Sequence, residues 1–73
     1  MGSKILLWVE GKTYKIMKED GKGQLHPAAN FVRDFPNEAK WFASRKKLRA
    51  WDSQGRELCA EEVVVLIEKS QTL

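Results

Sequence analysis

The first part of the chain constrains the fold more than any other segment, because two short apolar stretches flank a glycine turn. We predict strands at Lys4 to Val9 and Thr13 to Lys18, joined by Glu10-Gly11-Lys12. The second stretch alternates apolar and polar residues, which is typical of a strand with one wetter face. The first stretch does not alternate, so we expect it to be the more buried strand, with Trp8 in the core.

A polar loop and a short helix are predicted to follow this hairpin. Gly21 and Gly23 indicate turns in the loop, and Pro27 suits the first position of a helix. An apolar stripe continues to Phe35, where the helix must end, because a proline follows and disfavours helical geometry at the residue before it.

A second helix is predicted from Asn37, whose side chain can cap the first turn. On a helical wheel its apolar side holds Ala39, Phe42 and an edge formed by Trp41 and Leu48, and its outer side holds Lys40, Ala43, Ser44 and Lys47. Arg45 falls within the apolar arc. Either its stem lies over the core or the helix ends near it.

The last third of the chain predicts a second hairpin and one further element. Leu48 to Trp51 and Arg56 to Leu58 flank the turn Asp52-Ser53-Gln54-Gly55, where Gly55 can adopt a positive φ. For Cys59 to Lys69, the acidic start and the length favour a helix, and the valine run leaves a strand as the alternative.

The size of the chain limits it to one small α+β domain. Seventy-three residues support one core, and a single cysteine cannot form an internal disulfide. We expect one domain over residues 1–73, with disordered ends at 1–3 and 70–73. The absence of a long apolar run or a signal-peptide pattern predicts no membrane association and a reducing compartment, cytoplasmic or nuclear.

Basic residues are concentrated before the C-terminal segment. Twelve of the thirteen Lys and Arg residues precede Glu57, and the formal net charge is +3. The interval from Lys40 to Trp51 contains five basic residues and no carboxylate. Cations beside aromatic rings suit phosphate attraction combined with base stacking. A solvated face beside core aromatics explains the same pattern and stays open.

We therefore predict a non-catalytic nucleic-acid-binding protein, accessory or regulatory, with DNA favoured over RNA. The predicted contact residues are Lys40, Ser44, Arg45, Lys46, Lys47, Arg49, Trp51 and Arg56. The main alternative is a protein-interaction module, a small adaptor or inhibitor that docks through an exposed tryptophan or the acidic C-terminal segment. A homodimer formed by pairing of sheet edges is the third alternative.

The sequence contains no strong indication of a catalytic or metal-binding site. His26 has no cysteine nearby and is expected to be a surface or capping residue rather than a metal ligand. Cys59 is expected to be buried as a small hydrophobe rather than to act as a nucleophile. The adjacent carboxylates Glu61 and Glu62 suit a helix start. We predict no enzyme activity, no cofactor and no metal.

The segment from Gly55 to Lys69, GRELCAEEVVVLIEK, resembles the wing-to-helix segment of winged helix-turn-helix proteins of the MerR and excisionase type. The resemblance implies that the helix from about Asn37 is a recognition helix, with Arg56 at the wing and with Lys40, Ser44, Lys47 and Arg49 toward DNA. The chain departs from that pattern in two ways, because a hairpin comes first and Phe35-Pro36-Asn37 is not the usual turn.

Overall fold

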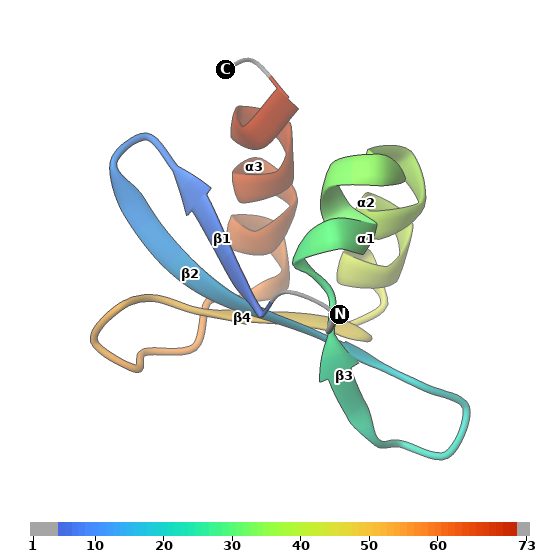
Figure 1. Cartoon of the computed structure of the whole chain (residues 1–73). Coiled ribbons are helices and arrows are strands. Elements are labelled where there is room, and N and C mark those ends of the chain that lie inside the picture. Colours follow the sequence, from blue (N-terminus) through green and yellow to red (C-terminus); the bar gives the residue numbers. More distant parts are fainter. Residues whose placement is uncertain (1–4, 72–73) are drawn as a thin grey trace.

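Strand β2 organises the fold, because it has hydrogen-bonded partners along both edges. The computed structural model describes residues 5–71. The elements in chain order are β1 (Leu6–Val9), β2 (Lys12–Glu19), β3 (Leu25–Pro27), α1 (Ala29–Asp34), α2 (Pro36–Ser44), β4 (Leu48–Trp51) and α3 (Ala60–Gln71) (Figure 1). Together they form the predicted α+β domain, with a four-stranded antiparallel sheet and three helices.

Strands β1 and β3 share one edge of β2, and β4 occupies the other edge. β1 pairs with the first half of β2 in the register Leu6 with Lys15, and β3 pairs with the second half in the register Met17 with Pro27. β4 pairs Trp51 with Lys15 and Leu48 with Lys18. The sheet therefore continues across a gap between β1 and β3, where the Ile16 carbonyl accepts a hydrogen bond from the Ala28 N–H at 3.0 Å.

The first hairpin forms where the sequence predicts it, but its loop is one residue shorter because Lys12 already belongs to β2. Its loop contains Glu10 at φ 52° and Gly11 at φ 82° between the paired residues Val9 and Lys12. Positive φ at both loop residues matches the twist of antiparallel strands, and glycine adopts it without a Cβ clash. Local chemistry at Gly11 therefore sets the register of β1 against β2.

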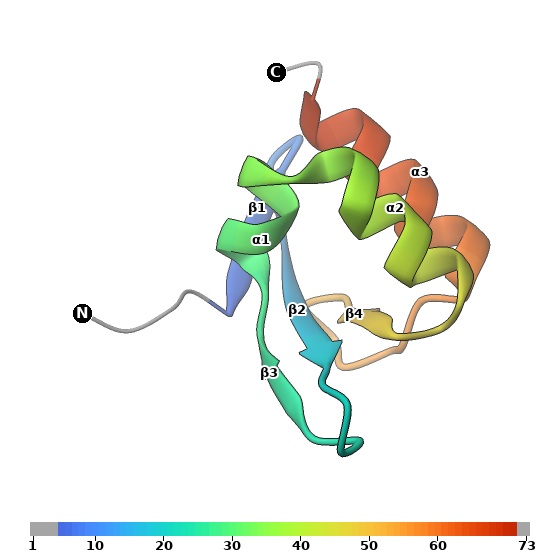
Figure 2. The same cartoon turned by 90° about the vertical axis from the view of Figure 1, so that its right-hand side faces the viewer.

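All three helices pack on one face of the sheet, and the core lies between the helices and the sheet (Figures 1 and 2). The sheet contributes Val9, Ile16, Leu48 and Ala50 to this core. Helical residues that complete it are Val32, Ala39, Ala43, Val63, Leu66 and Ile67. Ile16 is fully buried at the centre of β2, so it is the residue around which both layers meet.

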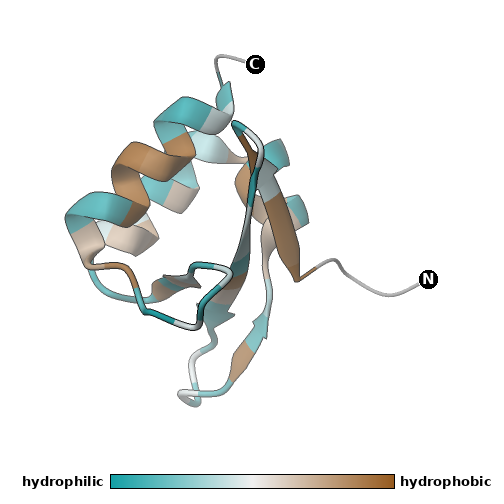
Figure 3. Ribbon diagram, turned by 90° about the vertical axis from the view of Figure 1, so that its left-hand side faces the viewer, coloured by the Kyte–Doolittle hydropathy of each residue, from teal (hydrophilic) through white to brown (hydrophobic). Residues whose placement is uncertain are grey.

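The prediction that β1 is the more buried strand is wrong. Trp8 is 63% exposed and Leu6 is 60% exposed, whereas Val9 is 2% exposed. Leu6 and Trp8 share a face with their β2 partners Lys15 and Thr13, and the helices pack against the opposite face. Figure 3 shows β1 as an apolar strand at the edge of the sheet with no helix in front of it. We call this uncovered side the outer face.

The helix boundaries are only partly as predicted. Pro27 ends the short strand β3 instead of opening a helix, because its neighbourhood pairs with β2. α1 ends at Asp34, which confirms the predicted stop at Phe35. α2 begins at Pro36, and no side chain caps it, so the predicted capping role of Asn37 is wrong. Proline at the first helical position lacks an N–H that would otherwise stay unsatisfied.

The predicted orientation of the second helix is also corrected. Ala43 is buried together with Ala39, whereas Trp41 is 51% exposed. The small side chains lie inward because α2 packs closely against α3. The helix ends at Ser44, and Arg45 is its C-terminal cap residue. Of the two predicted explanations for Arg45, the one in which the helix ends near it is therefore correct.

The predicted second hairpin forms in part. β4 takes its place in the sheet by pairing with β2, and the turn after it closes with the single bridge between Trp51 and Glu57. The C-terminal segment is a helix, as the acidic start indicated, and it continues through Ser70 and Gln71. Residues 1–4, 72 and 73 lie outside the described part, as do the predicted start of the first strand at Lys4 and the predicted disordered ends at 1–3, 72 and 73. Within residues 5–71, no helix combines the length and apolar composition needed to cross a membrane.

Candidate nucleic-acid interface

The fold separates the eight predicted contact residues into three groups. Ser44, Arg45, Lys46 and Lys47 stay together at the end of α2 and in the turn to β4. Arg49 and Trp51 lie on β4, and their β2 partners place them on the outer face of the sheet. Lys40 and Arg56 each contact a carboxylate of α3. The continuous basic run of the sequence is therefore not one continuous surface.

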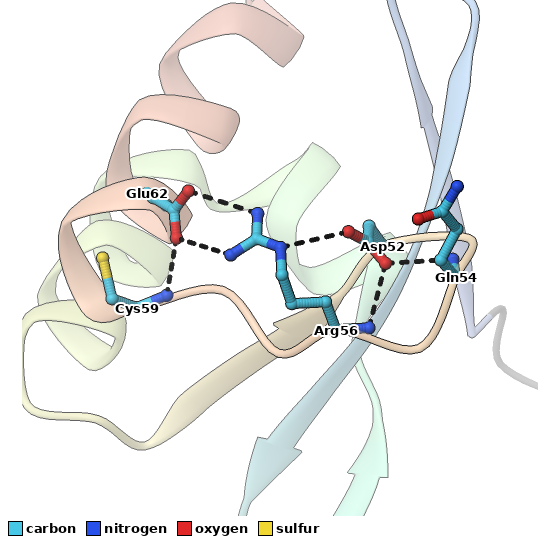
Figure 4. Close-up of polar contacts among 5 residues, drawn as sticks. All are labelled: Asp52, Gln54, Arg56, Cys59 and Glu62. Carbon is cyan, nitrogen blue, oxygen red and sulfur yellow. Dashed lines mark hydrogen bonds and ion pairs between the residues drawn. The ribbon is translucent and has the colours of Figure 1, made fainter.

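Arg56 is held between Asp52, in the turn after β4, and Glu62, in the first turn of α3 (Figure 4). Its Nε lies 3.4 Å from Asp52 Oδ2, and its Nη2 donates to Glu62 Oε2 at 3.4 Å. Glu62 Oε1 also accepts from the backbone N–H of Cys59 at 3.0 Å, as in a capping box. Arg56 therefore links the turn after β4 to the first turn of α3.

Hydrogen bonds keep these carboxylates ionised. The N–H of Cys59 and then the Arg56 guanidinium lower the pKa of Glu62 below its usual value. The pKa of Asp52 is lowered chiefly by the backbone N–H of Arg56 and then by that of Gln54. The charge of Arg56 is thus compensated within the protein, and a phosphate would have to compete with two carboxylates for it.

Arg49 is also neutralised, but on the outer face. Its guanidinium donates to both oxygens of Glu57, from Nε at 2.7 Å and from Nη2 at 2.9 Å. These bonds lower the pKa of Glu57. Arg49 lies 4.9 Å above the ring of Trp51, and Lys15 Nζ lies 5.4 Å from the same ring. Such a bidentate pair is geometrically specific and holds Arg49 in place.

Lys40 lies on the side of α2 next to α3 and is partly exposed. Its Nζ lies 4.0 Å from Glu68 Oε2, and its side chain is 33% exposed. Glu68 is 28 positions from Lys40 in the sequence, and the two residues meet because α2 and α3 pack side by side. A recognition-helix role with Lys40 toward DNA, which the MerR-type resemblance implied, does not match this orientation.

Two further cations near the end of α2 lie over aromatic rings. Arg45 lies 4.3 Å above the ring of Trp41, which is half exposed and packs edge-on against Phe42. From β2, Lys18 Nζ lies 4.5 Å from the ring of Phe42. No carboxylate within residues 5–71 forms an ion pair with these cations. We define the basic-aromatic surface as Lys18, Trp41, Arg45, Lys46 and Lys47.

Lys18 and Trp41 are the two members of this surface that are absent from the predicted contact residues, and Lys18 lies farther from them in the sequence. It lies 22 positions before Lys40, inside a strand whose polar residues alternate. The register that pairs Lys18 with Leu48 brings it beside the end of α2. Ser44, by contrast, donates its hydroxyl to the Trp41 carbonyl at 2.7 Å, which leaves its oxygen as an acceptor.

The turn after α2 is closed by backbone hydrogen bonds. The N–H of Lys47 donates to the Phe42 carbonyl at 2.9 Å, and the N–H of Lys46 donates to the Ala43 carbonyl at 3.0 Å. This is a Schellman motif, in which the residue at the position of Lys46 adopts the left-handed region and is usually glycine. Lys46 has φ 62°. The chain therefore has a lysine where glycine would be less strained.

Replacing Lys46 by glycine is expected to stabilise the fold by about 0.5–1 kcal/mol, because glycine adopts the left-handed conformation without steric cost. Lys47 provides the matched control, since Lys46 has a positive φ and Lys47 does not. Lys47→Gly is expected to be neutral or destabilising. Urea denaturation followed by tryptophan fluorescence compares the two variants, and equal effects would contradict the assigned strain.

His26 and Cys59, the two residues whose types could support catalysis or metal binding, are both exposed. His26 is exposed, and its Nε2 lies 2.7 Å from Asp20 Oδ2. This hydrogen bond, followed by those from the N–H groups of Gln24 and Lys22, lowers the pKa of Asp20 to about 2. Cys59 is exposed, so its predicted burial is wrong. It precedes the first residue of α3, where the N–H groups need solvent or a cap rather than a core.

A hollow of 610 Å³ lies between the first hairpin, the turn after β4 and α3. Its lining includes the buried residues Leu58 and Leu66 and both acidic and basic side chains, among them Glu61 and Lys12. Among the described residues, no cluster of three His, Cys, Asp or Glu side chains could hold a metal ion. The predicted lack of enzyme activity stays a prediction.

Comparisons of the chain with protein-family models, with curated proteins and with solved structures gave no match.

Proposed function

We propose that the protein binds nucleic acid without catalysis, through the basic-aromatic surface at the end of α2. The observation that carries this proposal is the run Arg45, Lys46 and Lys47, which is exposed and forms no ion pair within residues 5–71. Arg45 also stacks on the half-exposed ring of Trp41. Phosphate groups require such uncompensated cations, and bases stack on such rings.

The distribution of ion pairs supports this location. Glu57, Glu62 and Glu68 neutralise the basic residues that lie farther from the end of α2. A positive surplus is therefore left around the α2–β4 turn, where Lys18 adds a cation from β2. Cations that the fold has already paired with carboxylates gain less from a phosphate.

The strained lysine supports the same location. A residue in the left-handed region costs on the order of 1 kcal/mol when it is not glycine. Lys46 tolerates this cost at the centre of the basic run, with φ 62°. Glycine would be more stable at this position, whereas lysine adds a positive charge that glycine lacks.

The exposed aromatic ring favours single-stranded over duplex nucleic acid as the ligand. Bases in a duplex are stacked on each other, whereas unpaired bases are free to stack on Trp41. We propose an accessory or regulatory role in the cytoplasm or nucleus, where a reducing environment would keep the exposed thiol of Cys59 unoxidised. The adaptor alternative loses part of its basis, since Glu62 and Glu68 of the acidic segment are engaged internally.

Fluorescence anisotropy with labelled single-stranded and duplex DNA and RNA, over a range of salt concentrations, tests the proposal. If three to four cations contact phosphates, the logarithm of affinity for a single strand should fall with the logarithm of salt at a slope of about −2 to −3. Duplexes of the same length should bind more weakly. Affinity that does not change with salt, or no binding at low salt to any of the four polymers, would reject the proposal.

A further inference from the structure

Strand β1 is an edge strand whose outer backbone groups have no partner in the described sheet. The Ile16 N–H donates to the carbonyl of Ile5, the residue before β1, at 2.8 Å, so Leu7 and Val9 are the residues of β1 that bond to β2. In an antiparallel pair the bonding residues alternate. The N–H and C=O groups of Leu6 and Trp8 therefore point away from β2, toward the open edge.

This edge lacks the features that keep sheet edges from pairing. Soluble proteins usually protect an edge strand with lysine, proline, a bulge or a covering segment. Leu6–Val9 is LLWV, four apolar residues in regular register with β2. Its outward side chains, Leu6 and Trp8, are the two most exposed large apolar residues of the described chain. Figure 3 shows this apolar strand at the margin of the sheet.

We propose that β1 pairs antiparallel with β1 of a second copy of the chain, which forms a symmetric dimer with one continuous sheet. With the two-fold axis at Leu7, Leu6 lies opposite Trp8 of the partner subunit, and each outward backbone group of these residues meets its complement. The strand is thus complementary to itself, because every side chain that meets across the new pair is apolar.

The charges of the outer face also suit a second copy. On the outer face Arg49 is paired with Glu57, and Glu19 lies on the same face of β2 as Lys15, although the whole chain has a net charge of +3. In the proposed register, Lys15 shares a rung with Leu6 and with Trp8 and Thr13 of the partner subunit, so no like charges are opposed. The basic-aromatic surface lies at the end of α2, away from this edge.

Analytical ultracentrifugation of the full chain, over a concentration series and without nucleic acid, tests the proposal. The parent protein is expected to sediment as a dimer of the 8.4 kDa chain at micromolar concentrations and to dissociate on dilution. Trp8→Lys is expected to weaken dimerisation by at least about 50-fold, because the lysine would be desolvated beside Leu6. Val65→Lys, which changes an exposed valine of α3, is the matched control and should leave the dimer intact.

Leu6→Pro provides a variant that acts through the backbone. The N–H of Leu6 points to the open edge, so proline removes no bond to β2 but blocks the new pair. We expect a folded monomer, with folding checked by circular dichroism. Amide exchange measured by NMR should show protection of the Leu6 and Trp8 N–H groups in the parent dimer and loss of protection on dilution.

Two results would overturn the proposal. One is a parent protein that remains monomeric up to the highest concentration at which it is soluble. The other is a dimer that persists in folded Trp8→Lys and Leu6→Pro variants, because its interface would then lie elsewhere. The sedimentation experiment contains no nucleic acid, so a result against the dimer would not bear on nucleic-acid binding. The anisotropy titration tests nucleic-acid binding separately.

Discussion

Replacing Lys46 and Lys47 together by glutamate is expected to lower affinity for single-stranded nucleic acid on the order of 100-fold. Both residues are exposed and form no ion pair within residues 5–71. Two attractions to phosphate become two repulsions at the centre of the basic-aromatic surface. Surface substitutions of this kind usually change stability by about 0.5 kcal/mol each, so the variant should stay folded.

Lys12→Glu with Lys22→Glu is the matched control. Both lysines are exposed, and each double variant changes the net charge from +3 to −1. Lys12 begins β2 at the first hairpin and Lys22 lies in the loop after β2, so neither belongs to the basic-aromatic surface. Anisotropy titrations and thermal melts of both variants measure the difference. An equal loss of affinity in the control would mean that net charge, and not this surface, determines binding.

Ile16→Ala is expected to destabilise the protein by about 3–5 kcal/mol, enough to leave a small domain largely unfolded at 37 °C. Ile16 is fully buried in the strand that has partners on both edges. Truncation of its side chain opens a cavity between the sheet and the helices. Ala39 and Ala43 belong to the same core, and their side chains are too small to fill the cavity.

Val65→Ala serves as the comparison for this loss. Val65 is a β-branched residue like isoleucine, but it is 46% exposed on α3. Alanine has the higher helix propensity, so this substitution is expected to be neutral or slightly stabilising. Urea denaturation of both variants gives the two free energies. If Ile16→Ala and Val65→Ala differed by less than about 1 kcal/mol, the core would not lie where the structure places it.

Several elements could be predicted because a few neighbouring residues determine them. Gly11 allows the positive φ that a two-residue hairpin loop needs, and Pro36 prevents α1 from continuing. Glu61 and Glu62 place negative charge at the first turn of α3, where the helix dipole favours it. These effects act over one helical turn or one reverse turn, so the sequence alone contains them.

Burial in β1 and the position of β4 could not be read from the sequence in the same way. Ile5, Leu6, Leu7, Trp8 and Val9 have similar hydrophobicity, and their exposure differs because helices cover one face of the sheet and leave the other face open. β4 pairs with β2, which is distant in sequence, and not chiefly with the segment after its own turn. Pairing between distant segments depends on the packing of the whole domain.

The sequence by itself determined that the chain is an α+β domain whose basic residues gather around the end of the second helix. Only the tertiary structure decided which of these basic residues are paired with carboxylates and which can contact a ligand. Glu57 and Glu68 neutralise Arg49 and Lys40, while strand pairing brings Lys18 beside the end of α2. The physical reason is that an ion pair depends on distance in space, which falls to a few ångströms between residues that the sequence separates by as many as 28 positions.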